Sequence, residues 1–230
     1  MSAALWNKKL ACPFCNAEFE TTRLRASAIR IKEKFTDFGS GFEGISPYFY
    51  SITACPSCSI AARNEEFEKF MPGYEPKLME VSKKLKGKAG NHEAFHVGEL
   101  TAEQAVKRHE LAITMHQFRA HSDAGELAGL YMHIAWIYRS NGNPEPERKA
   151  LAQAAVAYQE FYEKGNKLPE KLGEPGILYL IGEINRRIGN VKEARSYFSR
   201  ALTSKELGAF PNIENMLREG MLTAKDQLQG

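Results

Sequence analysis

Two short cysteine motifs carry the strongest chemical signal in this sequence. Cys12 and Cys15 belong to a CPFC motif, Cys55 and Cys58 belong to a CPSC motif, and the chain has no other cysteine. The two-residue spacing lets both thiolates of one turn face the same point, so two such turns supply the four ligands of a tetrahedral zinc site. Four cysteines leave no open coordination position for catalysis. We therefore predict one structural Zn²⁺ per chain, bound by these four residues.

Disulfide bonds and thioredoxin-like redox chemistry are the two alternatives for these cysteines. Disulfides suit secreted proteins, whereas the N-terminal sequence MSAALWNKK lacks the apolar segment of a signal peptide. Redox activity needs a CxxC motif inside a βαβ pattern, usually a single one, and this chain has two motifs and no such pattern. We therefore expect a cytoplasmic protein whose cysteines bind metal.

A second motif, HEAFH, matches the HExxH string of zinc metallopeptidases. In those enzymes two histidines one turn apart on a long helix bind zinc, and the glutamate between them is the general base. Here His92, Glu93 and His96 lie between Gly90 and Gly98, which leaves only seven residues for a helix that should be long. We favour a chance match and predict no catalytic residue. A peptidase, or a second metal at this string, stays an alternative that loss of activity on substitution of Glu93 would support.

Basic residues near the N-terminus raise the alternative of a nucleic-acid-binding zinc ribbon. The predicted strand region contains Arg23, Arg25, Arg30, Lys32 and Lys34. Residues 1–63 nevertheless contain eight Lys/Arg against five Asp/Glu, and the whole chain has a formal net charge of only +3. That excess is small for a nucleic-acid-binding surface. Nucleic acid is therefore a possible partner but not the favoured one.

The cysteines must be positioned by a small β module, because residues 1–60 read as strands and turns. Residues 23–35 alternate apolar and polar side chains with a change of face near Ala28, which predicts a strand with a bulge or bend. Residues 36–47 are glycine-rich and predict a loop. Residues 48–54 are aromatic and β-branched, which predicts a second strand leading into Cys55.

From residue 61 to residue 230 we predict a helical domain. Helical periodicity indicates helices at about 60–71, 75–88, 101–120, 123–140, 145–164, 175–188, 191–204 and 212–228. The lysine-rich stretch 77–88 is typical of a solvated helix face. Capping pairs mark two helix starts, Thr101 with Gln104 and Asp123 with Glu126. No apolar run is long enough for a membrane span, so no membrane association is expected.

An internal repeat refines this prediction. Tetratricopeptide-like spacing is seen for Leu178, Ile181, Gly182, Gly189, Ala194, Phe198 and Ala201. The first half of the pattern recurs at Tyr131, Ile134, Ala135, Tyr138 and Gly142. The fold class we expect is mainly α, with tetratricopeptide-like antiparallel helical repeats and a small N-terminal zinc-ribbon-like β module. An unrelated helical bundle is the alternative.

Several strings together resemble a known bacterial family. They are the CPFC turn, RLRASAIRI, YFYSITACPSCSIAARNEEF, LTAEQAVKRHELAI and LYMHIAWIYRSNGN. They look like the domain-of-unknown-function 2225 family, over most of the chain. The resemblance implies a zinc-ribbon-like start followed by tetratricopeptide-like helices, with the four cysteines as metal ligands, and it implies no activity.

The function we favour is that of a non-enzymatic interaction protein, a scaffold or adaptor. Stacked helix pairs form a concave surface on which a protein or peptide partner can lie. Tyr131, Tyr138 and Tyr179 are candidates to line that surface, although for any single one of them a place in the core is favoured. Nucleic-acid binding and a metallopeptidase are the alternatives.

Overall fold

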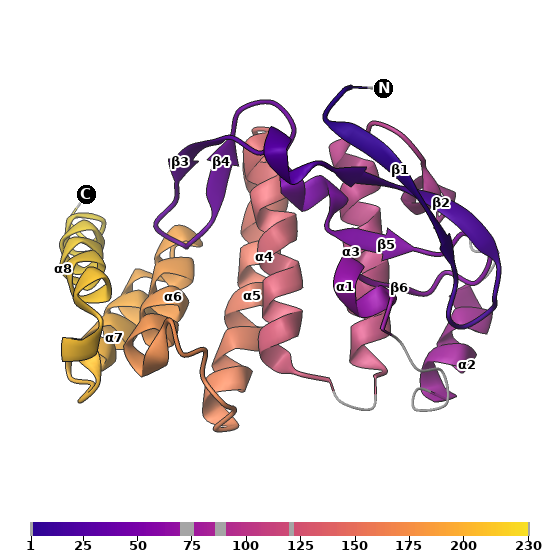
Figure 1. Ribbon diagram of the computed structural model, residues 1–230. Helices are drawn as coiled ribbons and strands as arrows, with labels where there is room; N and C mark the ends of the chain where they lie inside the picture. Colours follow the sequence, from indigo (N-terminus) through magenta and orange to yellow (C-terminus); the bar gives the residue numbers. More distant parts are fainter. Residues whose placement is uncertain (1, 70–75, 86–90, 120–121, 230) are drawn as a thin grey trace.

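The protein is mainly α-helical with small N-terminal pairs of antiparallel strands, as the sequence predicts. A computed structural model describes residues 2–69, 76–85, 91–119 and 122–229. Figure 1 shows the helices side by side in chain order, with most of the strands at the N-terminal end of the row and one strand pair above its middle. The C-terminus lies at the opposite end.

The first two strands form a hairpin whose tip carries the first cysteine pair. β1 (Leu5–Ala11) pairs antiparallel with β2 (Glu18–Leu24), from Leu5 opposite Leu24 to Ala11 opposite Glu18. The predicted strand at 23–35 is wrong in extent, because β2 ends at Leu24 and a 3₁₀ turn follows at Ala26–Ala28. The change of face near Ala28 therefore marks a break between two strands rather than a bulge within one.

A second hairpin occupies part of the region predicted as loop. β3 (Ile31–Lys34) pairs antiparallel with β4 (Ser40–Phe42), with an irregularity between Ile31 and Glu33. The prediction of a loop over 36–47 is therefore wrong for β4. Glycine at 41 permits the pairing, since a Cβ there would lie 2.9 Å from the Glu33 side chain.

A third hairpin carries the second cysteine pair. β5 (Ile52–Ala54) pairs antiparallel with β6 (Ala61–Arg63). The predicted strand at 48–54 is shorter than expected, because Pro47–Tyr50 forms a 3₁₀ turn that Ser46 caps. The predicted helix at 60–71 is also wrong at its start: β6 comes first, and α1 (Asn64–Phe67) follows it. The segment 70–71 lies outside the described residues.

The remaining helices lie close to the predicted ranges. They are α2 (Pro76–Leu85), α3 (Ala102–Gln117), α4 (Ala124–Ser140), α5 (Pro144–Glu163), α6 (Gly173–Arg187), α7 (Val191–Leu202) and α8 (Pro211–Asp226). Thr101 and Gln104 form the predicted reciprocal capping box. Asp123 caps α4 by accepting from the backbone N–H groups of Gly125 and Glu126. In the described part of the chain, no helix is both long and apolar enough to cross a lipid bilayer.

Neighbouring helices pack in pairs, α4 with α5 and α6 with α7. The two helices of the second pair approach closely at Gly182, since a Cβ there would lie 2.6 Å from the Phe198 ring and 3.1 Å from the Ala194 carbonyl oxygen. Tyr179 is only 1% exposed and stacks on Phe198 at 5.7 Å. Tyr179 is therefore a core residue of the α6–α7 pair.

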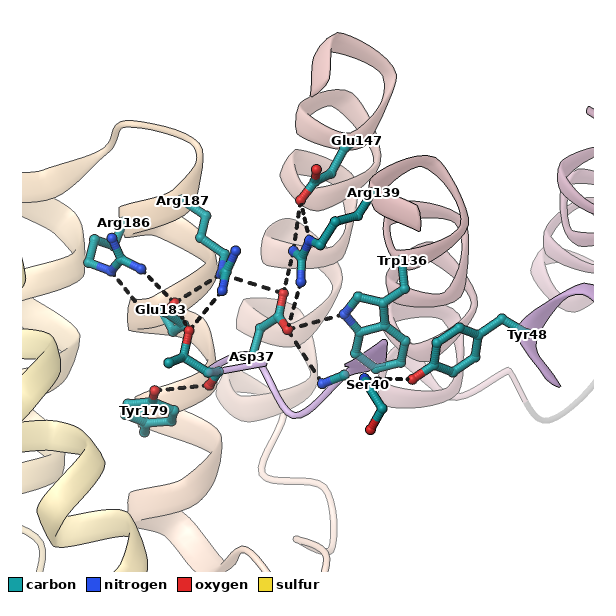
Figure 2. A network of polar contacts seen from close by, with 12 residues as sticks. Asp37, Ser40, Tyr48, Trp136, Arg139, Glu147, Tyr179, Glu183, Arg186 and Arg187 are labelled. Atoms are coloured by element: carbon teal, nitrogen blue, oxygen red, sulfur yellow. Dashed lines mark hydrogen bonds and ion pairs between the residues drawn. The ribbon is translucent and has the colours of Figure 1, made fainter. Parts of the chain in front are cut away.

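The β3–β4 hairpin reaches along the helices and inserts its turn between α4 and α6. Asp37, at that turn, is fully buried and accepts from Arg139 Nη2 at 2.6 Å and from Trp136 Nε1 at 3.2 Å (Figure 2). Arg187 of α6 lies 3.6 Å from the same carboxylate. Tyr179 donates to the Thr36 carbonyl at 2.9 Å. One buried carboxylate thus ties the β region to two helices distant in sequence.

The β region and the helices also share a core. Ile52, Ala54 and Ala61 belong to the same buried cluster as residues of α3, α4 and α5. The division of the chain into domains at residue 60 stays a prediction from the sequence.

Candidate metal centre

The two cysteine motifs form matching turns at the tips of two hairpins. Residues 12–17 connect β1 to β2, and residues 55–60 connect β5 to β6. In the first turn the Asn16 N–H donates to the Cys12 carbonyl at 2.9 Å; in the second the Ser59 N–H donates to the Cys55 carbonyl at 2.9 Å. Two segments far apart in sequence therefore adopt the same hydrogen-bonded turn and present the same side chains.

Each turn contains a residue in the left-handed backbone region directly after its second cysteine. Asn16 has φ 57° and Ser59 has φ 60°, and neither is glycine. This conformation costs about 1–2 kcal/mol for an L-residue. The same unfavourable geometry in both turns indicates that the placement of the sulfurs selects it. Neither residue is predicted from the sequence. An asparagine directly after a CxxC motif could have indicated the left-handed residue, because asparagine tolerates this backbone region.

The structure brings all four predicted ligand residues together. The four Sγ atoms all lie within 4.8 Å of one another. Cys12 Sγ lies 3.6 Å from Cys58 Sγ, and Cys15 Sγ lies 3.7 Å from Cys55 Sγ. A tetrahedron with metal–sulfur bonds of about 2.3 Å has edges of about 3.8 Å. The sulfurs are therefore spaced for a single metal ion at their centre, and this cluster could hold one.

These sulfur contacts argue against redox pairing within one motif. Both join one turn to the other, whereas a CxxC redox dithiol closes within its own turn. A disulfide needs sulfurs at about 2.05 Å, and all four cysteines are free. The arrangement suits a shared ligand.

The cluster lies in a small apolar core. Cys12, Cys55 and Cys58 are buried, whereas Cys15 is exposed. Phe14 and Phe67 pack in the same core. Ser82 of α2 donates a short hydrogen bond to the Cys58 carbonyl, so α2 covers the second turn. The site is closed on most sides and reaches solvent at Cys15.

The thiols of Cys12, Cys55 and Cys58 do not ionise independently. Hydrogen bonds from the Cys55 and Cys58 side chains lower the pKa of Cys12 to about 2. The hydrogen bonds with Cys12 in turn raise the pKa of Cys55 to about 12 and also raise the pKa of Cys58. One sulfur thus takes a negative charge at the expense of its neighbours. A divalent cation removes this conflict, because it stabilises several thiolates at once.

The HEAFH string does not form the helix that a metallopeptidase requires. Its first four residues lie in a 3₁₀ turn, Asn91–Phe95, which ends before His96. A 3₁₀ helix has about three residues per turn, so positions i and i+4 do not share a face. The His96 carbonyl accepts from Arg108, and Glu93 is exposed. The His92 side chain lies outside the described part of the chain.

The basic residues of the predicted nucleic-acid strand do not lie on one strand. Arg23 is only 8% exposed and lies 3.5 Å from Glu68. Arg30 donates to the carbonyls of Ser27 and Ile29. Lys32 and Lys34 are exposed on β3, in the next hairpin. The break at Ala26–Ala28 divides the cations between two elements.

A buried cluster of histidines lies where the β region meets α3 and α4. Ser51 Oγ is 3.2 Å from His109 Nε2 and 3.3 Å from His133 Nδ1. His109 Nδ1 donates to the Ala105 carbonyl at 2.8 Å, so Nε2 is the acceptor for Ser51. Burial lowers the pKa of His109 to about 4 and holds the pKa of His133 well below its usual value, with Arg63 adding to both effects. These rings are packed, neutral hydrogen-bonding groups.

The chain belongs to the DUF2225 family, described as uncharacterized proteins conserved in bacteria. The family model matches residues 5–223 and so includes all four cysteines and most of α8. This confirms the resemblance inferred from the sequence. No significant match was found among curated proteins or solved structures. The family description names no activity, so the function must be argued from the molecule.

Proposed function

We propose that this protein is a non-enzymatic interaction protein, in which a structural zinc site orders the N-terminal hairpins and tetratricopeptide-like helix pairs bind a protein or peptide. The observation that carries the proposal is a groove on the helices, lined by half-buried tyrosines. The zinc site supports the body that carries this groove.

Zinc is the metal that best suits the cysteine cluster. Sulfur ligands select Zn²⁺, Cu⁺ or iron, and four sulfurs at tetrahedral spacing suit a single zinc or iron ion. Cys12, Cys15, Cys55 and Cys58 would fill the coordination shell, so the ion would have no position for substrate. Its role is therefore structural: it links the tips of two hairpins that are far apart in sequence.

Metal analysis of the purified chain tests the zinc site. We expect one zinc per chain, lost in Cys12→Ser and retained in His92→Ala. Zinc lost in His92→Ala and retained in Cys12→Ser would contradict the site and favour HEAFH. Iron in place of zinc would contradict the proposal that the metal is zinc, and it would be recognised by the colour of the protein.

The groove lies between α3, α4 and α5 and has a volume of about 440 Å³. Its floor contains Ile113 and Ile134, which are 7% and 5% exposed. Tyr131 and Tyr138 also line it and are half-buried, as expected of residues that offer one face to a partner. Burial raises the pKa of both phenols, so both hydroxyls stay protonated. An apolar floor with tyrosines is typical of a binding surface.

The packing of the helix pairs also supports an interaction protein with tetratricopeptide-like repeats. α4 with α5 and α6 with α7 are consecutive pairs, and Gly182 allows the close packing that the tetratricopeptide pattern requires. The repeat of 47 residues from Ala135 to Gly182 exceeds the usual length of about 34. The surplus lies in α5, which has 20 residues, and in the segment after it. We interpret these pairs as irregular tetratricopeptide-like repeats.

Affinity capture from a bacterial lysate tests the groove. The full chain, Tyr131→Ala/Tyr138→Ala and the control Leu222→Ala would be compared by quantitative mass spectrometry. Leu222 is 64% exposed on α8, at the other end of the row of helices (Figure 1). We expect proteins captured by the native chain and by Leu222→Ala, but not by the double variant. Equal capture by all three chains would contradict the proposal.

A further inference from the structure

A second cavity, separate from the peptide groove, is lined by aromatic rings. It has a volume of about 450 Å³ and lies between β4, the 3₁₀ turn Pro47–Tyr50, the start of α3 and the end of α4. Its aromatic and charged lining residues are Phe42, Tyr48, Phe49, Tyr50, Trp136 and Glu99. We call it the aromatic pocket. Its volume is in the range of small-molecule sites.

The Phe42 and Tyr48 rings meet edge to face and form a corner, and the Trp136 ring lies tilted beside Tyr48. Phe42 and Tyr48 have centroids 5.4 Å apart at 79°. Tyr48 and Trp136 have centroids 4.9 Å apart at 33° (Figure 2). Phe42, Tyr48 and Trp136 are half-buried, so each has surface available to a ligand. Ring faces carry negative electrostatic potential, which attracts a cation placed among them.

Hydrogen bonds fix these rings in place. The Tyr48 hydroxyl accepts from the Ser40 N–H at 3.0 Å, and the Tyr50 hydroxyl accepts from the Leu100 N–H at 3.0 Å. Trp136 Nε1 donates to Asp37, and the Gly39 backbone packs against the indole because glycine has no Cβ there. A pocket whose walls are held in this way loses little conformational freedom on binding.

The charges around the pocket also favour a cation. Glu99 is exposed and is the one carboxylate among the described lining residues, which include no lysine or arginine. The nearby guanidinium of Arg139 faces away into ion pairs with Asp37 at 2.6 Å and Glu147 at 2.7 Å (Figure 2). A positively charged ligand would therefore meet ring faces and one carboxylate.

We propose that the aromatic pocket binds a small organic cation through a quaternary ammonium group. Its methyl groups would contact Phe42, Tyr48 and Trp136, and the Glu99 carboxylate would balance its charge. A methylated nitrogen has no N–H group to satisfy, which suits walls made of rings. The proposal goes beyond the peptide groove, shares none of its lining residues and does not depend on it.

Titration of the full, metal-loaded chain with choline or tetramethylammonium tests this proposal by calorimetry. The matched control is 3,3-dimethyl-1-butanol, which has the shape of choline with carbon in place of the charged nitrogen. We expect the neutral compound to bind at least about tenfold more weakly, as removal of cation–π attraction implies. Equal affinity for the neutral compound would overturn the proposal and indicate an apolar site. No binding of either cation would overturn it as well.

Variants of the lining residues test where the cation binds and distinguish a loss of binding from a loss of the fold. Glu99→Gln changes an exposed residue, and Phe42→Leu removes a ring but keeps an apolar side chain. We expect both to weaken choline binding severalfold, while Phe42→Tyr keeps it. Trp6→Phe leaves Trp136 as the sole tryptophan, so its fluorescence reports occupancy directly. Unchanged affinity in Glu99→Gln together with unchanged Trp136 emission on saturation would contradict this site.

Discussion

The cysteine-centred region and the C-terminal helices are stabilised by different kinds of contact. Among the residues that the structure describes, three of the ten buried members of the core around the cysteine cluster are cysteines. The core of α6, α7, α8 and the end of α5 has twelve described buried members, all of them hydrophobic and none a cysteine. On the zinc site proposed above, the first region would depend on a bound ion to hold short hairpins together, whereas the second depends on packed side chains. The stability of the cysteine-centred region should therefore depend on metal binding, and the stability of the C-terminal helices should depend on the volume of their buried side chains.

The largest expected effect is that of metal removal. A structural zinc site contributes on the order of 10 kcal/mol of folding free energy, so a chelator or Cys58→Ser should disorder both cysteine hairpins. Hydrogen exchange followed by mass spectrometry should show fast exchange in β1, β2, β5 and β6, and continued protection in α6 and α7. Loss of protection along the whole chain would show that the two regions are not separable.

The next largest effect should come from the link between the regions. Asp37→Ala removes the fully buried carboxylate of an ion-pair network and leaves the largely buried Arg139 and Arg187 without the group they share. Breaking such a pair costs about 3–5 kcal/mol. Urea unfolding should show this loss, and Lys32→Ala, at an exposed position on β3, should be close to neutral. A small effect of Asp37→Ala would mean that the hairpin is held by its other contacts.

Acid should weaken the junction between the regions. The pKa of His109 falls from 6.5 to about 4 on folding, because burial disfavours its charged form. The unfolded chain therefore binds more protons between these values, and stability decreases as the pH falls from 6.5 towards 4. The slope from one such group is at most about 1.4 kcal/mol per pH unit. His109→Gln should reduce the slope measured by urea unfolding, and an unchanged slope would contradict this assignment.

The smallest effect tests packing in the C-terminal helices. Gly182→Ala places a Cβ against Phe198, and overpacking of this kind costs about 1–3 kcal/mol. Gly208→Ala is the matched control, since a Cβ there meets nothing within 4 Å. Thermal unfolding should separate the two variants. Equal melting temperatures would show that α6 and α7 move apart at little cost.

The helices could be predicted well because their signals are local. Periodicity and caps placed 191–204 against the observed Val191–Leu202, and Thr101 forms its predicted capping box. The four cysteines could also be predicted as a cluster, since their spacing within each motif is local and metal chemistry joins the two motifs. The groove tyrosines Tyr131 and Tyr138 stay predicted partner contacts.

The strands and the buried polar groups could not be predicted, because long-range contacts determine them. The end of β2 at Leu24 and the pairing of β3 with β4 depend on where the hairpin docks on the helices. Asp37 reads as an ordinary loop residue, yet its main partner Arg139 is 102 residues away. The aromatic pocket could not be predicted for the same reason, since its rings come from segments predicted as loop (Phe42), strand (Tyr48) and helix (Trp136).

The position of Asp37 also has a consequence for synthesis of the chain. At about 5–20 residues per second, Asp37 is made roughly 5–20 s before Arg139. During that time its carboxylate and the β3–β4 hairpin have no docking surface, so the hairpin cannot reach its final place until α4 and then α6 are complete. The N-terminal part of the protein is thus the first to be translated and among the last to be finished.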